Sequence, residues 1–139
     1  MKPGKGADNP RGLGPAGTVH CSLRDWSKFI ALHLQGARGE YRLLKAESFQ
    51  RLHTPQPIDD KSGYALGWIV LERPWGDGSV LMHNGSNTMW YSVVWIAPKR
   101  GFAVMAVTNL AGLGLEDGAA GTDAVVSLLI EKQGKPTKD

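Results

Sequence analysis

Apolar residues recur at helical spacing in two stretches of the chain. In the first they form one stripe on a helix that begins after Ser22: Leu23, Trp26, Ile30 and Leu34. Ser22 is a typical N-cap, Asp25 occupies the capping-box position, and Gly36 is a typical helix end. Residues 46–53 predict a shorter second helix, which ends at Thr54 because the residue before a proline is disfavoured in the helical region.

The middle of the chain changes to runs of β-branched and aromatic residues separated by turn residues, which is typical of consecutive strands. The runs that we expect to form strands are residues 64–72, 79–83, 90–97 and 102–108. The last two are apolar on both faces, so a sheet built from them must be covered on both sides. Residues 123–132, extended backward into an Ala/Gly-rich segment, predict a final helix.

This order of elements predicts an α+β fold, an antiparallel meander sheet flanked by an N-terminal and a C-terminal helix. A chain of 139 residues fits one domain, which we place at residues 18–133. Residues 1–17 are rich in Gly and Pro and are expected to form a flexible, extended arm, and residues 134–139 a disordered tail. The helices are few for a sheet that needs cover on both faces.

Composition and charge narrow the function classes. The net charge of +3 comes mainly from basic residues near the two ends, and no basic run alternates with aromatic residues, which argues against nucleic-acid binding. The single cysteine, Cys21, excludes an internal disulfide. The sequence shows neither a signal peptide nor an apolar run long enough for a membrane span, so a cytoplasmic location and no membrane partner are expected.

The most promising segment for ligand chemistry comes at the end of an apolar run: His83, Asn84, Gly85 and Ser86. A glycine allows the backbone to approach a ligand closely, and the side chains around it supply hydrogen-bonding groups. Trp68, Trp90 and Tyr91 are candidates for the wall of such a pocket. The four histidines are scattered without metal-ligand spacing, and no phosphate loop is present, so neither a metal nor a cofactor is expected.

Several segments, taken in order, resemble the serine β-lactamase-related family, which includes class C β-lactamases, DD-peptidases and related esterases. The sequence Tyr-Ala-Leu-Gly-Trp at residues 64–68 is similar to the family's Y-G-L-G-W strand. Residues 83–86 resemble its third active-site motif, Lys/His-Thr-Gly. Other segments resemble an earlier part of the family sequence and its last hairpin: residues 15–19, 22–29, 95–104 and 108–109. The resemblance covers residues 15–132.

The resemblance implies a mechanism of which this sequence carries only a part. In the family, the serine of a Ser-x-x-Lys motif forms an acyl intermediate, and a Tyr-x-Asn motif assists proton transfer. Neither pattern occurs in the sequence. We therefore expect only the C-terminal part of the family fold, with no catalytic residue.

Only the third motif can be carried over residue by residue. His83 matches its Lys/His position and Gly85 its glycine, whereas Asn84 replaces the usual hydroxyl residue. The amide of Asn84 is still able to donate a hydrogen bond to a ligand, and the backbone N–H of Ser86 corresponds to one oxyanion-hole donor. A purely structural His83, hydrogen-bonded at a strand end, is the alternative.

Three functions are compatible with these observations. The first is a truncated β-lactamase-related protein without autonomous hydrolase activity. The second is a small-ligand or peptide-binding module that uses the pocket at residues 83–86. The third is one half of a serine hydrolase whose nucleophile lies on another chain.

The resemblance also bears on self-association. In the family, the last strand pairs with a strand from the N-terminus, and without that strand the edge Phe102–Thr108 would stay open. Open strand edges pair with other chains. We therefore expect a homodimer, formed through this edge or through the apolar face beside it.

Overall fold

The computed structural model describes residues 9–40, 43–60, 62–87, 89–110 and 115–134 of the chain. Residues 1–8 of the expected arm and residues 135–139 of the expected tail lie outside this described part. Among the described residues, no helix combines the length and the apolar character that crossing a membrane requires.

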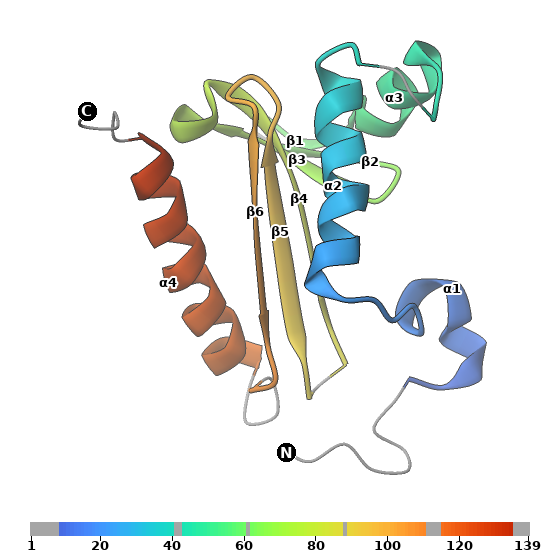
Figure 1. The fold of residues 1–139 in the computed structure, drawn as a ribbon, viewed down its shortest axis with the longest axis vertical. Helices are drawn as coiled ribbons and strands as arrows, with labels where there is room; N and C mark the ends of the chain where they lie inside the picture. Colours follow the sequence, from blue (N-terminus) through green and yellow to red (C-terminus); the bar gives the residue numbers. More distant parts are fainter. Residues whose placement is uncertain (1–8, 41–42, 61, 88, 111–114, 135–139) are drawn as a thin grey trace.

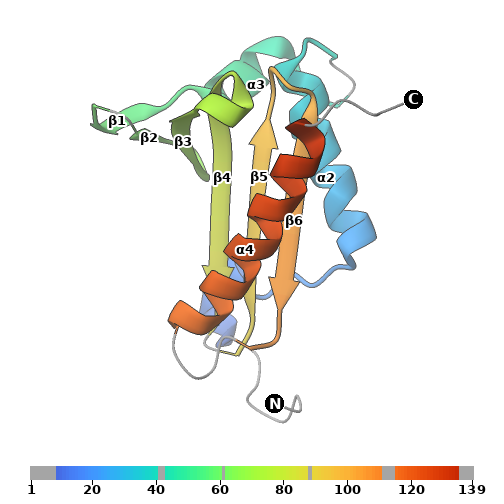
Figure 2. The same ribbon diagram turned by 90° about the vertical axis from the view of Figure 1, so that its left-hand side faces the viewer.

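Among the described residues, six strands form one sheet, in which every strand pairs antiparallel with its neighbours in the chain. Their bounds are Gln56–Asp59 (β1), Ser62–Ala65 (β2), Trp68–Arg73 (β3), Gly78–Ser86 (β4), Tyr91–Ala97 (β5) and Phe102–Thr108 (β6). Figures 1 and 2 show this meander between two long helices. The predicted α+β fold with a meander sheet is thereby confirmed.

The two long helices cover opposite faces of the sheet. The α-helices are α1 (Gly14–Gly17), α2 (Leu23–Ala37), α3 (Ala46–His53) and α4 (Leu115–Gly134). Alternate residues of β5 point to the two sides: Val94 and Ile96 join Ile30 of α2 in one buried cluster, whereas Val93 joins Val126 of α4 in another. In the part of the chain that the structure describes, one long helix on each side therefore covers strands that are apolar on both faces.

Helix α2 begins at the predicted N-cap. The side-chain oxygen of Ser22 accepts a hydrogen bond from the backbone N–H of Asp25 at 3.1 Å, which satisfies one of the free donors of the first turn. The helix ends at Ala37, one residue after the expected Gly36. Gly36 is buried against the ring of Phe49 in α3, and a methyl group at this position would overlap the ring. This glycine therefore allows α2 and α3 to pack closely.

The single strand expected at residues 64–72 is in fact the hairpin of β2 and β3. Ala65 pairs with Trp68, which leaves Leu66 and Gly67 as a two-residue turn. Their φ angles are 41° and 107°, and positive φ at both central positions is the geometry that suits tight hairpins. Because Asn or Asp usually stands where Leu66 does, the sequence did not reveal this turn. Strand β1 was not predicted either, because proline and aspartate are unusual in strands.

Residues 11–17 are helical rather than extended. They contain the 3₁₀ turn η1 (Arg11–Leu13) and the short helix α1. The side-chain amide of Asn9 donates to the carbonyl of Gly17 at 2.7 Å. Pro15 lies in the first turn of α1, where its fixed φ suits a helix start. The sequence predicts an extended arm here because these turns have no hydrophobic periodicity.

Candidate functional site

The residues of the candidate motif lie in the second half of β4, which is longer than expected and ends at Ser86. In the pairing with β5, His83 lies opposite Val94 and Gly85 opposite Ser92. Because side chains alternate along a strand, His83 shares the α2 face of the sheet with Val94. The side chains of Asn84 and Ser86 belong to the α4 face. The motif is thus divided between the two faces.

A cavity of about 530 Å³ lies on the α2 face. His83 and Gly85 line it from β4, together with Trp68 of β3 and Ser92 of β5. Helix α2 supplies a largely apolar wall that includes Trp26, Phe29, Leu32 and His33. This arrangement places one exposed histidine and an accessible glycine backbone at the edge of a hydrophobic space, which is a common design of small-ligand sites.

Asn84 borders the same cavity, but its side chain has a partner on the other face of the sheet. Its Nδ2 group donates a hydrogen bond to the hydroxyl of Tyr91 at 3.0 Å. Tyr91 is buried in the cluster beneath α4. In this structure the amide therefore ties β4 to β5, and its bond to Tyr91 competes with any bond to a ligand.

Of the three aromatic residues expected in the pocket wall, Trp68 lines the cavity. Tyr91 does not, because it faces α4. Trp90 is 40% exposed and is also not among the lining residues. Its backbone N–H donates to Oδ1 of Asn87 at 2.9 Å, so it belongs to the turn between β4 and β5. The aromatic wall comes instead from Trp26 and Phe29 of α2.

Two histidines, whose contact the sequence did not predict, lie in contact beside this cavity. Nδ1 of His33 in α2 lies 2.9 Å from Nε2 of His53 in α3, so one ring N–H donates to the other ring. Aromatic rings surround His33, with the centroids of Phe29 and Trp68 at 4.7 and 5.0 Å. Burial lowers the pKa of His33. Burial, and next the charge of His33, lower the pKa of His53 to about 4, so both rings are neutral at pH 7.

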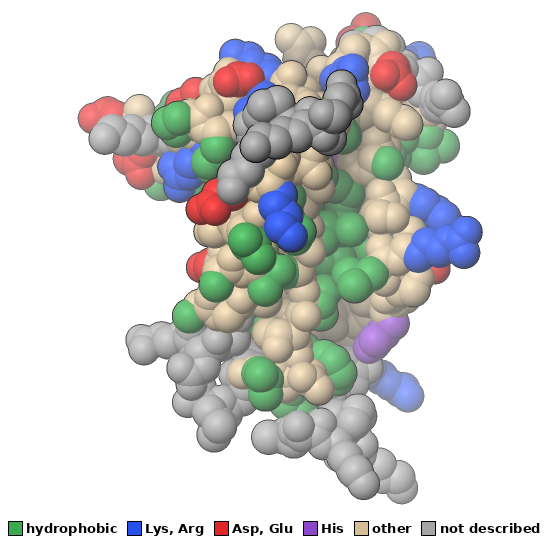
Figure 3. All heavy atoms as spheres, turned by 60° about the vertical axis from the view of Figure 1, so that its left-hand side comes forward, with side chains coloured by type: hydrophobic (Ala, Val, Ile, Leu, Met, Phe, Trp, Pro, Cys, Tyr) green, Lys and Arg blue, Asp and Glu red, His purple; other side chains and the backbone are tan. Residues whose placement is uncertain are grey.

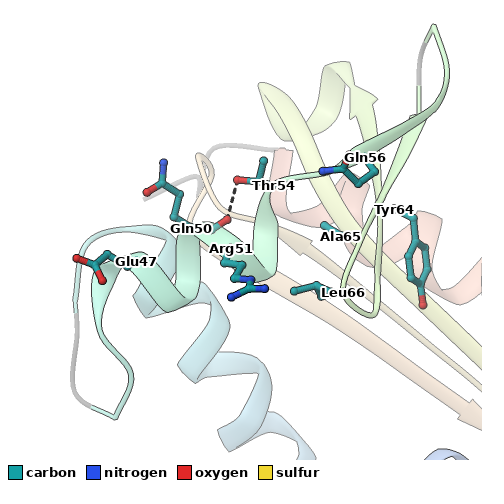
Figure 4. A pocket seen from close by; sticks show the side chains of 8 residues that line it. All are labelled: Glu47, Gln50, Arg51, Thr54, Gln56, Tyr64, Ala65 and Leu66. Carbon is teal, nitrogen blue, oxygen red and sulfur yellow. Dashed lines mark hydrogen bonds between the residues drawn. The ribbon is translucent and has the colours of Figure 1, made fainter.

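A second cavity, of about 470 Å³, lies on the other side of the turn between β2 and β3. Figure 4 shows its lining, with side chains of α3 such as Glu47 and Arg51 on one side and Tyr64 and Leu66 on the other. Thr54, which donates to the carbonyl of Gln50 at 2.7 Å, closes the end of α3 there. No serine, cysteine, lysine or histidine is among the described residues that line this second cavity.

The cavity on the α2 face offers hydrogen-bond donors for a ligand but few groups suited to acyl transfer. His83 and the backbone around Gly85 are able to donate hydrogen bonds to a carbonyl or a carboxylate. No lysine or tyrosine is among the described residues that line it. In the described part of the chain, no three metal-ligating side chains come together. The geometry therefore suits recognition of a polar group attached to an apolar body.

Comparison with known proteins places these observations in a family. Residues 1–127 match the family model described as Beta-lactamase. No curated protein and no solved structure matches the chain. The family match covers most of the sequence, including α2, α3 and all six described strands. The chain belongs to the β-lactamase family.

Proposed function

We propose that this chain provides the ligand-binding wall of a β-lactamase-type site and does not hydrolyse esters or amides by itself. The supporting observation is the cavity on the α2 face, where His83 and Gly85 stand beside Trp68. The sequence contains no Ser-x-x-Lys and no Tyr-x-Asn. Acyl transfer needs a nucleophile with a base within hydrogen-bond reach, and the described lining residues supply no such lysine or tyrosine.

The chemistry of the lining defines the ligand class. The cavity is apolar and aromatic where it is lined by Trp26, Phe29 and Trp68. At the edge of the cavity, His83 is able to donate a hydrogen bond from its ring N–H. A small molecule or peptide end that joins an aromatic or aliphatic group to a carboxylate fits both features. Such contacts are expected to give modest affinity, because the histidine is exposed and water competes for it.

Turnover assays test the non-catalytic part of the proposal. The purified protein is mixed with a chromogenic cephalosporin and, separately, with p-nitrophenyl acetate. We expect rates equal to those in buffer. Turnover that co-purifies with the protein and disappears in Ser92→Ala, the variant of the serine that lines the cavity, would contradict the proposal.

A nuclear magnetic resonance titration tests binding. Benzylpenicillin serves as the probe, because it joins an aromatic group to a carboxylate. We expect shifts of the backbone amides at residues 83–86 and of the Trp68 indole. His83→Ala is expected to weaken binding, whereas His20→Ala, the exposed control on the chain before α2, leaves it unchanged. Shifts confined to the second cavity, or no shifts at all, would count against the site.

A second function follows from the same cavity: one half of a composite hydrolase. The binding groups of β4 are present, while a lysine and a tyrosine are missing among the described residues of the lining. A separate chain with Ser-x-x-Lys and Tyr-x-Asn motifs would supply them. Mixing the two chains is expected to produce ester turnover that neither shows alone, and the activity should depend on His83.

A further inference from the structure

The two edges of the sheet differ in how well they are protected against pairing with another chain. Strand β1 has four residues, a register shift between Pro57 and Asp59, and no buried side chain. Short length, proline, charge and irregular pairing are the features by which proteins protect sheet edges. Strand β6, at the opposite edge, has seven residues and pairs with β5 without a shift.

Strand β6 carries none of the protective features of β1. Its sequence, Phe-Ala-Val-Met-Ala-Val-Thr, has no charge and no proline. Among the described residues, no strand pairs with its outer side. A regular, uncharged edge of this length presents a row of backbone N–H and C=O groups that matches another strand.

The surroundings of β6 favour an apolar partner. Val107 is 45% exposed on the α2 face, and Val125 and Leu129 of α4 are 49% and 38% exposed. Figure 3 shows hydrophobic side chains over α4 and in the hollow beside it, toward α2. A partner strand laid along β6 would cover part of this surface as well as satisfy the backbone groups.

We propose that β6 pairs antiparallel with β6 of a second copy of this chain, so that two sheets join into one across a two-fold axis. The choice of a second copy follows from the two edges. Pairing of β6 with β1 would build an open filament, and β1 is protected. When β6 of one copy pairs with β6 of another, both copies use the same edge, so the assembly is complete with two copies. The strand carries no charge, so the pairing brings no like charges together.

Sedimentation velocity of the whole chain over a range of concentrations tests the pairing. We expect wild-type protein to approach twice its mass of 15.0 kDa. Val107→Lys adds a charge to the open edge and is expected to give monomers. The matched control, Ile58→Lys, adds the same charge to an exposed residue of the opposite edge and should leave the dimer intact.

Two results would overturn the proposal: a wild-type monomer at every concentration, or a dimer that Val107→Lys leaves intact. If Val107→Lys does not fold, hydrogen exchange of the wild-type protein decides instead. Amides of β6 should become more protected as protein concentration rises, while those of β1 should not change. If the exchange protection of the β6 amides does not change with protein concentration, a second copy is not the partner. The same conclusion holds if these amides become protected only when a different protein is added.

Discussion

His33 and His53 join helices α2 and α3 through a ring-to-ring hydrogen bond of 2.9 Å between Nδ1 and Nε2. His33 is 4% exposed and packs among aromatic rings. Such a bond needs one ring nitrogen that donates and one that accepts. When both rings are protonated no acceptor is left and two positive charges face each other, so the contact requires at least one of the two rings to stay neutral.

This pair predicts that stability falls in mild acid. The pKa of each ring is lowered from 6.5 in the folded chain, and that of His53 reaches about 4. The unfolded chain therefore binds protons first, so the stabilisation is complete above pH 6.5 and decreases as the pH falls toward 4. The slope is at most about 1.4 kcal/mol per pH unit for each histidine.

Urea unfolding between pH 7.5 and 4.5 measures this slope. In His53→Gln the amide is still able to form a hydrogen bond with His33, but it does not titrate, so we expect a smaller slope. The control is His20→Gln, which removes an exposed histidine and should keep the wild-type slope. Equal slopes in wild type and His53→Gln would show that the pair does not control acid stability.

The contact of Gly36 with Phe49 predicts an unusual effect of alanine. In most helices Gly→Ala is stabilising by roughly 0.5–1 kcal/mol. At position 36 a methyl group would overlap the Phe49 ring, so we expect Gly36→Ala to destabilise the protein by about 1–3 kcal/mol. Gly121→Ala in α4, where nothing lies within 4 Å of an added Cβ, should be stabilising. Free energies of unfolding that move in the same direction for both variants would contradict this packing.

The N-cap of α2 predicts the effect of removing one hydroxyl. Ser22→Ala loses the hydrogen bond to the Asp25 N–H, which we expect to lower the free energy of unfolding by about 1 kcal/mol. The control is Ser27→Ala, because Ser27 lies inside the same helix and is expected to change stability little. A loss at position 27 as large as at position 22 would rule out a capping role.

The bond between Asn84 and Tyr91 predicts coupled effects of two substitutions. We expect Asn84→Ala and Tyr91→Phe each to destabilise the protein, and the double variant to lose less than the sum. The coupling free energy should be about 0.5–1.5 kcal/mol. Strict additivity in thermal or urea unfolding would mean that the two side chains do not interact in solution.

The sequence predicted the helices and strands correctly where caps, prolines or apolar runs favour one type of element. The helix start at Ser22, the helix Ala46–His53 and the strand Phe102–Thr108 were predicted with the observed bounds. The hairpin at Leu66 was missed, because leucine rarely takes positive φ and the flanking run is continuously apolar. In the candidate site, His83, Gly85 and Trp68 were predicted and line one cavity.

The sequence by itself determined the long helices and most of the strands, because periodicity and capping are local properties. It also indicated the family, because motif order is a property of the chain. Only the tertiary structure placed the Asn84 amide on Tyr91 and His33 on His53. These contacts join residues on different strands or on different helices. No local sequence pattern encodes the register between two strands or the angle at which two helices cross. The same is true of the outermost position of β6 among the described strands, because the order of strands in the sheet decides it.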